Sequence, residues 1–410
     1  MSHVNRMLTV MLGTLLLISS VGFTQDWPQW RGVNRDGKVT GFIAPQTLPP
    51  TLAQQWKVKV GAGDASPVLV GDKLYVFAAQ GDQEMTFCLN VADGTQRWQD
   101  KYTTPPITGP AASRHPGPRG TPAVADGKVV TLGVNGVVSC LDAATGKLLW
   151  RKDEFPKMAP MFFAAMSPLI TDGLAIAQLG GKDQGGIIAF ELATGNVKWR
   201  WLGEGPEYAS PALMTAGGVK QIVTLTNKSL VGVAVADGKL LWTLPFVPQS
   251  RAYNAATPII DGQMVIYTGA TRGTHAITVE KKGETFTTTE LWSNPAVSVQ
   301  YNTPVLKDGL LFGLSDHGNF FCLDAKTGKT AWIDPTVTDH MGFGTLLDVG
   351  VAMLALPSSG ELIAFKPIAQ AYTEQARLKI AETPTYGSPI IAGKRIFVKD
   401  QDAVILWVLN

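Results

Sequence analysis

The stretch CLDAATGKLLW at residues 140–150 returns almost unchanged as CLDAKTGKTAW at residues 322–332. Looser copies read CLNVADGTQRW at 88–98, AFELATGNVKW at 189–199 and GVAVADGKLLW at 232–242. In each copy an apolar strand leads into a turn that contains glycine, and a second strand carrying a tryptophan follows. Glycine supplies the positive φ that tight hairpins require, so the phrase predicts a recurring β-hairpin.

A second phrase alternates with the first and consists of Ser-Pro or Thr-Pro, an apolar strand and a turn, most often with Gly. Successive copies lie 42–55 residues apart, and a period of about 40–50 residues with four short strands per unit is typical of a β-propeller. Eight copies predict eight blades in a single all-β domain. They start at Ser66, Thr121, Ser167, Ser210, Thr257, Thr303 and Ser388, with a degenerate copy at Gly344.

The two ends of the repeat array complement each other. The unit that begins at Ser388 stops after three strands and lacks its tryptophan strand, whereas LAQQWKVKV at 52–60 places Trp56 in an otherwise unassigned strand. An N-terminal strand that completes the last blade would remove the exposed sheet edges of an open ring. We therefore predict a single eight-bladed propeller of four-stranded blades over residues 52–410, closed by this strand.

One tryptophan recurs in the last strand of seven units, and Leu378 stands near the place where the eighth is due. A row of exposed indoles could form a stacking platform. Because there is one indole per unit at one position, packing between neighbouring blades, over the Thr-Gly turn of the same repeat, is favoured. The structural tryptophans are Trp56, Trp98, Trp150, Trp199, Trp242, Trp292 and Trp332.

The composition and the amino terminus limit location and partners. A net charge of +2 over 410 residues argues against a nucleic-acid partner, and three cysteines exclude a disulfide framework. Arg6 precedes an apolar stretch at 7–18, shorter than the roughly 20 residues of a membrane span, and small residues follow. Residues 1–24 are therefore predicted to be a signal peptide without a lipid-attachment cysteine. We expect a periplasmic or secreted monomer without a membrane span.

The tryptophan phrase resembles the tryptophan-docking motif of pyrroloquinoline-quinone (PQQ)-type propellers, and the resemblance covers nearly all of the chain after residue 24. The opening DWPQWRGVNRDG at 26–37 looks like the start of secreted PQQ-binding-like repeat proteins. Relatives in this superfamily include the quinoprotein alcohol dehydrogenases. They also include the propeller lipoprotein of the outer-membrane β-barrel assembly machinery, which is a non-catalytic scaffold.

Resemblance to the quinoprotein dehydrogenases would imply a Ca²⁺-bound PQQ, a catalytic Asp and a disulfide between adjacent cysteines. Cys88, Cys140 and Cys322 are never adjacent, and no compact Asp/Glu/Asn cluster marks a Ca²⁺ site. The histidines have no metal-ligand spacing, and no nucleophile elbow or phosphate-binding loop is present. The sequence identifies no catalytic residue and no metal site.

Three functional hypotheses follow. The favoured one is an exported binding or scaffold module for a protein, peptide or glycan, which needs no cofactor. The first alternative is an oxidoreductase that depends on PQQ and Ca²⁺. The second alternative is a polysaccharide lyase or hydrolase, which fold analogy alone supports.

Residues 25–51 precede the first strand and are predicted to be a docking segment. Trp27 and Trp30 lie among Pro and Gly residues without strand periodicity. They could form an exposed arm that binds a partner, but two tryptophans in a loop more often dock on their own domain. We predict that they pack against the propeller and cover a blade junction.

The residues that enter each inner strand should surround one mouth of the central channel. We call the Ser or Thr of each Ser/Thr-Pro phrase, and Thr345 in the degenerate copy, the marker of its unit. The residue two places before the marker is aromatic in four units, an acid in one and an arginine in another, and His317 lies on an adjoining loop. Aromatic faces with a few convergent polar groups suit a small-ligand or glycan pocket, although rings that merely fill the channel are an equal alternative. The predicted ligand-binding residues are Asp64, Arg119, Tyr208, Asn254, Tyr301, Phe343, Tyr386 and His317.

Overall fold

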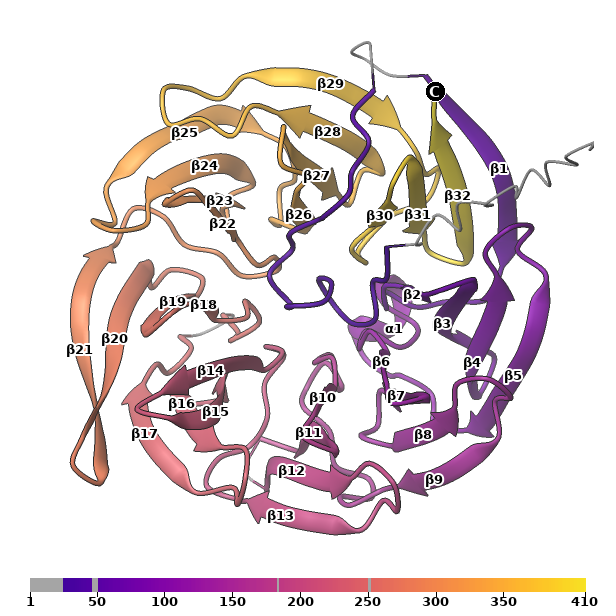
Figure 1. Ribbon diagram of the computed structural model, residues 1–410, viewed down its shortest axis with the longest axis horizontal. Coiled ribbons are helices and arrows are strands. Elements are labelled where there is room, and N and C mark those ends of the chain that lie inside the picture. Colours follow the sequence, from indigo (N-terminus) through magenta and orange to yellow (C-terminus); the bar gives the residue numbers. More distant parts are fainter. Residues whose placement is uncertain (1–24, 46–50, 183, 250–251) are drawn as a thin grey trace, which may run out of the picture.

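The computed structural model describes residues 25–45, 51–182, 184–249 and 252–410, so the predicted signal peptide lies outside the described residues. The chain forms a closed ring of eight antiparallel sheets, each with four strands, around a central channel (Figure 1). The single helix in the described ranges is the four-residue α1 (Ala111–Arg114). The predicted eight-bladed all-β propeller is confirmed. No helix in these ranges is long and apolar enough to cross a membrane.

Within a blade the strands follow one another from the channel outward, so the Ser/Thr-Pro strand is innermost (Figure 1). Blades one to four comprise β2 (Val68–Val70), β3 (Lys73–Gln80), β4 (Gln83–Asn90) and β5 (Gln96–Thr103); β6 (Ala123–Ala125), β7 (Lys128–Leu132), β8 (Val138–Asp142) and β9 (Leu148–Lys152); β10 (Leu169–Thr171), β11 (Leu174–Gly180), β12 (Gly185–Glu191) and β13 (Val197–Trp201); and β14 (Ala212–Ala216), β15 (Val219–Leu225), β16 (Ser229–Ala234) and β17 (Leu240–Pro245).

The same order continues in blades five to eight, and the last blade receives its outer strand from the start of the domain. These blades comprise β18 (Ile259–Asp261), β19 (Met264–Thr268), β20 (Thr274–Lys282) and β21 (Thr285–Asn294); β22 (Val305–Lys307), β23 (Leu310–Leu314), β24 (Asn319–Asp324) and β25 (Thr330–Val337); β26 (Gly344–Asp348), β27 (Met353–Pro357), β28 (Glu361–Phe365) and β29 (Glu374–Lys379); and β30 (Ile390–Ala392), β31 (Arg395–Lys399), β32 (Ala403–Leu409) and β1 (Leu52–Lys59).

The Asp-x-x-Thr-Gly turns form because a carboxylate satisfies the turn's donors. In blade two, Oδ1 of Asp142 accepts hydrogen bonds from the Thr145 amide and hydroxyl at 2.8 and 2.7 Å. Gly146 follows at φ 74°, where a Cβ would also lie 2.5 Å from the Trp98 ring. Only glycine fits both the backbone and the indole that packs over it. The indole therefore covers the Thr-Gly turn of the next repeat, and the sequence prediction of the same repeat was wrong.

The tryptophan strands connect neighbouring blades. Each indole is nearly buried and, with one exception, its Nε1 donates a hydrogen bond to a main-chain carbonyl of the following blade at 2.8–3.3 Å. An indole N–H that is buried must find such a partner. The donor and acceptor pairs are Trp56 and Val91, Trp98 and Ala143, Trp150 and Leu192, Trp199 and Val235, Trp292 and Ala325, and Trp332 and Ile368.

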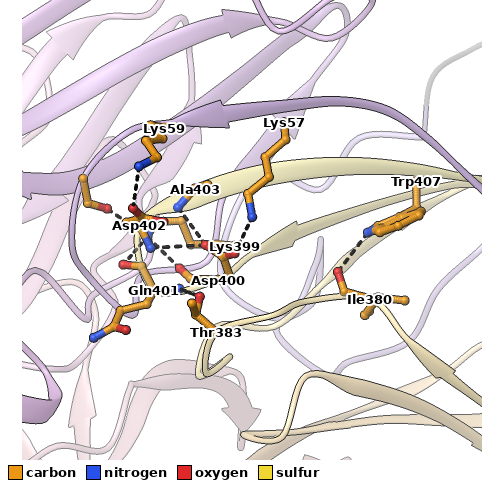
Figure 2. Close-up of polar contacts among 11 residues, drawn as sticks. Lys57, Lys59, Ile380, Thr383, Lys399, Asp400, Gln401, Asp402, Ala403 and Trp407 are labelled. Atoms are coloured by element: carbon orange, nitrogen blue, oxygen red, sulfur yellow. Dashed lines mark hydrogen bonds and ion pairs between the residues drawn. The ribbon is translucent and has the colours of Figure 1, made fainter.

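Blades four and seven depart from this pattern. In blade four, Nε1 of Trp242 donates to the buried Gln221 side chain of its own blade at 2.6 Å. In blade seven the register places Ala376, rather than the predicted Leu378, at the tryptophan position. Blades seven and eight are instead linked in the opposite direction, because Trp407 of blade eight donates to the Ile380 carbonyl after β29 at 3.0 Å (Figure 2).

The ring closes where β1 pairs with β32, as predicted (Figure 1). Beside this pairing, Lys399 is 2% exposed, and its ammonium donates to four main-chain carbonyls at 2.9–3.2 Å. Two of these carbonyls, from Gly61 and Gly63, belong to the chain that leaves β1 for blade one. The neighbouring Asp400 carboxylate pairs with Lys57 of β1 at 3.2 Å (Figure 2). Lys399 therefore connects the last blade to the segment that leads into blade one, and Asp400 holds β1 within the last blade.

The hydroxyls of the Ser/Thr-Pro phrases link the inner strands. In six blades the amide of the marker donates to the hydroxyl of the marker in the next blade at 2.6–3.2 Å. The chain of bonds is interrupted at blade seven, the blade with the degenerate copy, where the hydroxyl of Thr345 has no hydrogen-bond partner among the described residues. The acceptors in order are Ser66, Thr121, Ser167, Ser210, Thr257 and Thr303.

Residues 25–45 cross the central opening of the ring (Figure 1). Trp27 is 1% exposed and pairs through its main chain with Leu69 of β2. Further along the segment, the Val39 amide donates to the Asp348 carbonyl of β26, and the Asp348 amide donates to the Gly37 carbonyl. These contacts lie on strands of blades one and seven. Trp30, by contrast, lies at the channel, where it faces the cavity described below.

Candidate functional site: a cavity at the channel mouth

The channel contains a cavity of about 750 Å³ whose walls come from every blade. Six of the eight predicted ligand-binding residues line it. Each of them lies two residues before its marker, in the segment that leads into an inner strand. They are Asp64, Arg119, Tyr208, Tyr301, Phe343 and Tyr386. Trp30 and Arg31 of the segment 25–45 also line this cavity.

Aromatic rings form two groups on the wall. In one, Tyr301 stacks on Phe343 with ring centres 4.3 Å apart and planes 5° apart, and Tyr386 meets Phe343 edge-on at 5.2 Å. In the other, Phe162 and Tyr208 both meet Tyr253 edge-on, with ring centres at 5.1 and 5.7 Å. The rings pack against one another, yet they all still face the open cavity. They offer flat apolar surfaces with hydroxyls at their edges.

The polar part of the wall centres on His115, which follows α1. Its Nδ1 lies 2.5 Å from Oδ2 of Asp64, and its ring meets Tyr386 edge-on at 4.6 Å. Arg119 donates to the carbonyls of Phe162 at 2.5 Å and His115 at 2.9 Å. Burial lowers the pKa of the Arg119 guanidinium, and the Asp64 charge opposes that shift. Arg119 thus holds two segments of the wall together.

The other two predicted residues do not line the cavity. Asn254 is fully buried behind the wall, and its side-chain amide donates to the carbonyls of Thr226 and Phe246 at 2.8 and 3.0 Å. His317 lies in the turn before β24, and its side chain is 87% exposed. The structure therefore gives Asn254 a packing role and places His317 outside the cavity.

Several wall residues were not among the predicted ligand-binding residues. Trp30 and Arg31 come from the amino-terminal segment, and Phe162 and Tyr253 come from irregular loops. Arg114 ends α1, and His115 follows it. Nothing in the repeat pattern indicates that residues 25–45 reach the channel.

The donor set does not match a Ca²⁺-bound PQQ site of the quinoprotein kind. No group of three or more His, Cys, Asp or Glu side chains that could hold a metal exists among the described residues. The cavity wall in those ranges contains a single carboxylate, Asp64, which already contacts His115. Cys88, Cys140 and Cys322 are buried and unpaired in three different blades.

Comparison with known proteins places the chain in a family. The family model described as "Outer membrane protein assembly factor BamB" matches residues 88–334, so the chain belongs to this family of PQQ-like propellers. A relative with this name from Burkholderia pseudomallei is 25% identical over 373 residues, covering 86% of each chain. The match to the Yersinia pestis relative, at 24% identity, covers 55% of this chain and 60% of that protein.

Solved structures agree on the fold. BamB from Moraxella catarrhalis aligns with a TM-score of 0.62 at 14% identity, covering 87% of this chain and 98% of that one. The quinohemoprotein alcohol dehydrogenase from Comamonas testosteroni aligns with a TM-score of 0.68 at 14% identity, covering 94% and 80%. At these identities the likeness concerns the fold alone.

Proposed function

We propose that this protein is an exported, non-catalytic scaffold that binds a polypeptide at the mouth of its central channel. The family name describes assembly factors for outer-membrane proteins, and such a role requires binding of protein partners. The observation that carries the proposal is the cavity of about 750 Å³, walled by aromatic rings around a few polar groups. A glycan would use the same flat surfaces, and it is the alternative ligand.

A photoreactive phenylalanine analogue at Tyr301, on the cavity wall, tests this proposal. The matched position is Leu149, which is 41% exposed on β9 at the outside of the ring. After export and illumination in cells, we expect a polypeptide adduct from position 301 and none from position 149. Equal adducts from both positions, or no polypeptide adduct from position 301, would contradict the proposal.

The similarity to quinohemoprotein alcohol dehydrogenases supports a second candidate, an oxidoreductase that uses PQQ and Ca²⁺. The shortage of carboxylates at the cavity argues against it. Calorimetry with PQQ plus Ca²⁺ separates the two functions, since micromolar binding that requires the metal would favour the enzyme. A lyase or hydrolase has only fold analogy in its support.

A further inference from the structure

Two arginines of the amino-terminal segment lie buried in the channel. Arg31 is 2% exposed, and its Nη atoms donate to the carbonyls of Thr303 and Pro304 in blade six at 2.7 and 2.9 Å. Arg35 is 7% exposed and donates to the carbonyls of Ser167 and Pro168 in blade three at 3.0 Å each. The segment therefore spans the channel and is held on both sides by guanidinium groups.

Carbonyl oxygens satisfy hydrogen bonds but carry no net charge. Asp36 is the one described acid whose charge acts on Arg31, and none acts on Arg35. Buried charges are ordinarily paired with an opposite charge. Burial lowers the pKa of Arg31 to about 10 and that of Arg35 to about 9. Both values stay above neutral pH, so the channel retains two positive charges.

The cavity itself also has an excess of positive charge. Arg31, Arg114 and Arg119 line it, whereas the acids among the described wall residues are limited to Asp64. The Nε of Arg31 is buried and has no hydrogen-bond partner in the described part of the chain. Positive charge on the wall of a low-dielectric pocket concentrates the potential and attracts anions.

The indole of Trp30 lies beside this positive charge. The Arg31 guanidinium carbon lies 5.4 Å from the centre of the Trp30 ring, and that of Arg35 lies 5.5 Å away. Trp30 and Arg31 both face the cavity. A ligand that stacks on the indole would bring any attached acidic group close to the adjacent arginine.

We propose that the cavity binds the carboxylate of a ligand that also carries an aromatic ring, and that Arg31 and Trp30 of the amino-terminal segment recognise these two groups. The inference rests on the proposed function and specifies the part of the polypeptide that enters the cavity. Such a carboxylate could be the free end of a polypeptide or a small aromatic acid. The segment at 25–45 is then part of the binding site, in addition to connecting blades across the channel.

Calorimetry with matched pairs of probes tests this recognition. The probes are 3-phenylpropionate against its neutral amide, and a short peptide ending in phenylalanine with a free against an amidated carboxyl terminus. We expect each acid to bind roughly tenfold or more tightly than its amide, because a hydrogen bond to a charged group is worth about 1.5–3 kcal/mol. Peptide binding without phenylpropionate binding would identify a polypeptide end, and the reverse a small acid.

Variants locate the recognition within the channel. Arg31→Gln should lose about tenfold in affinity for the acid and leave the amide unchanged, whereas Arg31→Lys should lose less. Arg35→Gln is the control, since Arg35 is equally held by carbonyls but does not line the cavity. If Arg31→Gln does not fold, wild-type affinity for the acid must still weaken with added salt while that for the amide does not.

Acid and amide probes that bind equally, or an Arg31→Gln variant with undiminished affinity for the acid, would overturn the inference. Absence of binding by every probe would overturn it as well. The proposed function would survive each of these results if position 301 still gave a polypeptide adduct. It would fail separately if that adduct were absent.

Discussion

At the rim of the ring, the hydrogen bond from an indole to the following blade is repeated from blade to blade. At the channel, apart from the marker hydroxyls, the contacts made by the amino-terminal segment occur once. Six indoles donate to carbonyls of the following blade. Arg31 and Arg35, the buried cations in the channel, each have a carbonyl set found nowhere else in the described chain. The repeated contacts at the rim join neighbouring blades into a closed ring. The contacts that occur once, at the channel, hold the amino-terminal segment and shape the cavity.

The largest expected effect is at the rim. Trp150→Ala removes an indole that packs over Gly195 and donates to the Leu192 carbonyl. Because the cavity left behind cannot close fully, we expect a loss of about 3–5 kcal/mol in the free energy of unfolding, measured with denaturant. Leu149→Ala, on the exposed face of the same strand, should change stability by less than about 0.5 kcal/mol. Equal losses would show that the indole does not hold the junction.

A smaller loss is expected where the ring closes. Lys399→Met keeps the volume but leaves four carbonyls, two of them buried, without this donor. We expect a loss of about 2–4 kcal/mol in the free energy of unfolding. Lys59→Met breaks the exposed ion pair with Asp402, 3.7 Å away beside the same strand pairing, and should cost at most about 1 kcal/mol. If both variants lost the same amount, the Lys399 cradle would contribute no more than a surface ion pair.

The hydroxyls around the channel give a comparison within the hub. Thr257 accepts a hydrogen bond from the Ser210 amide at 3.0 Å, whereas the hydroxyl of Thr345 in blade seven has no partner among the described residues. Thr257→Val should cost about 1–3 kcal/mol by leaving a buried N–H unpaired, and Thr257→Ser should retain most of that stability. Thr345→Val should be neutral or stabilising in the same unfolding assay. A cost at position 345 equal to that at 257 would contradict this difference.

The rim could be predicted from the sequence because a repeated phrase fixes the register of its strand. The failure to place the tryptophan position of blade seven has a physical reason. Residues 366–373 join β28 to β29 without a Thr-Gly turn, unlike the short connection at 143–147, so counting from the turn is not available there. The register shifts by two, which puts Ala376 in place of Leu378.

The cavity could be predicted only where the repeat determines position. Tyr208 and Tyr301 were found by counting back from their markers, and both line the wall. Asn254 lies one residue before the position that faces the cavity in the other blades, so its side chain points into the packed interior. Arg31 reaches blade six over a sequence separation of 272 residues, and no local pattern encodes a contact of that kind. Ligand binding by the wall residues stays a prediction.

The smallest expected effect concerns a single carboxyl beside the channel. Burial raises the pKa of Glu207 to about 7 from its ordinary value of 4.5, and the charges of Lys182 and Arg272 oppose the shift only in part. Between these two values the folded protein binds more protons than the unfolded chain, because the unfolded carboxyl has already ionised. Stability should therefore fall as the pH rises from about 4.5 to 7 and then no longer depend on this group. Glu207→Gln stays neutral throughout, so denaturant unfolding at several pH values should show a shallower fall in the variant and a more stable variant at pH 8. Parallel curves for the two proteins would mean that Glu207 ionises normally in the fold.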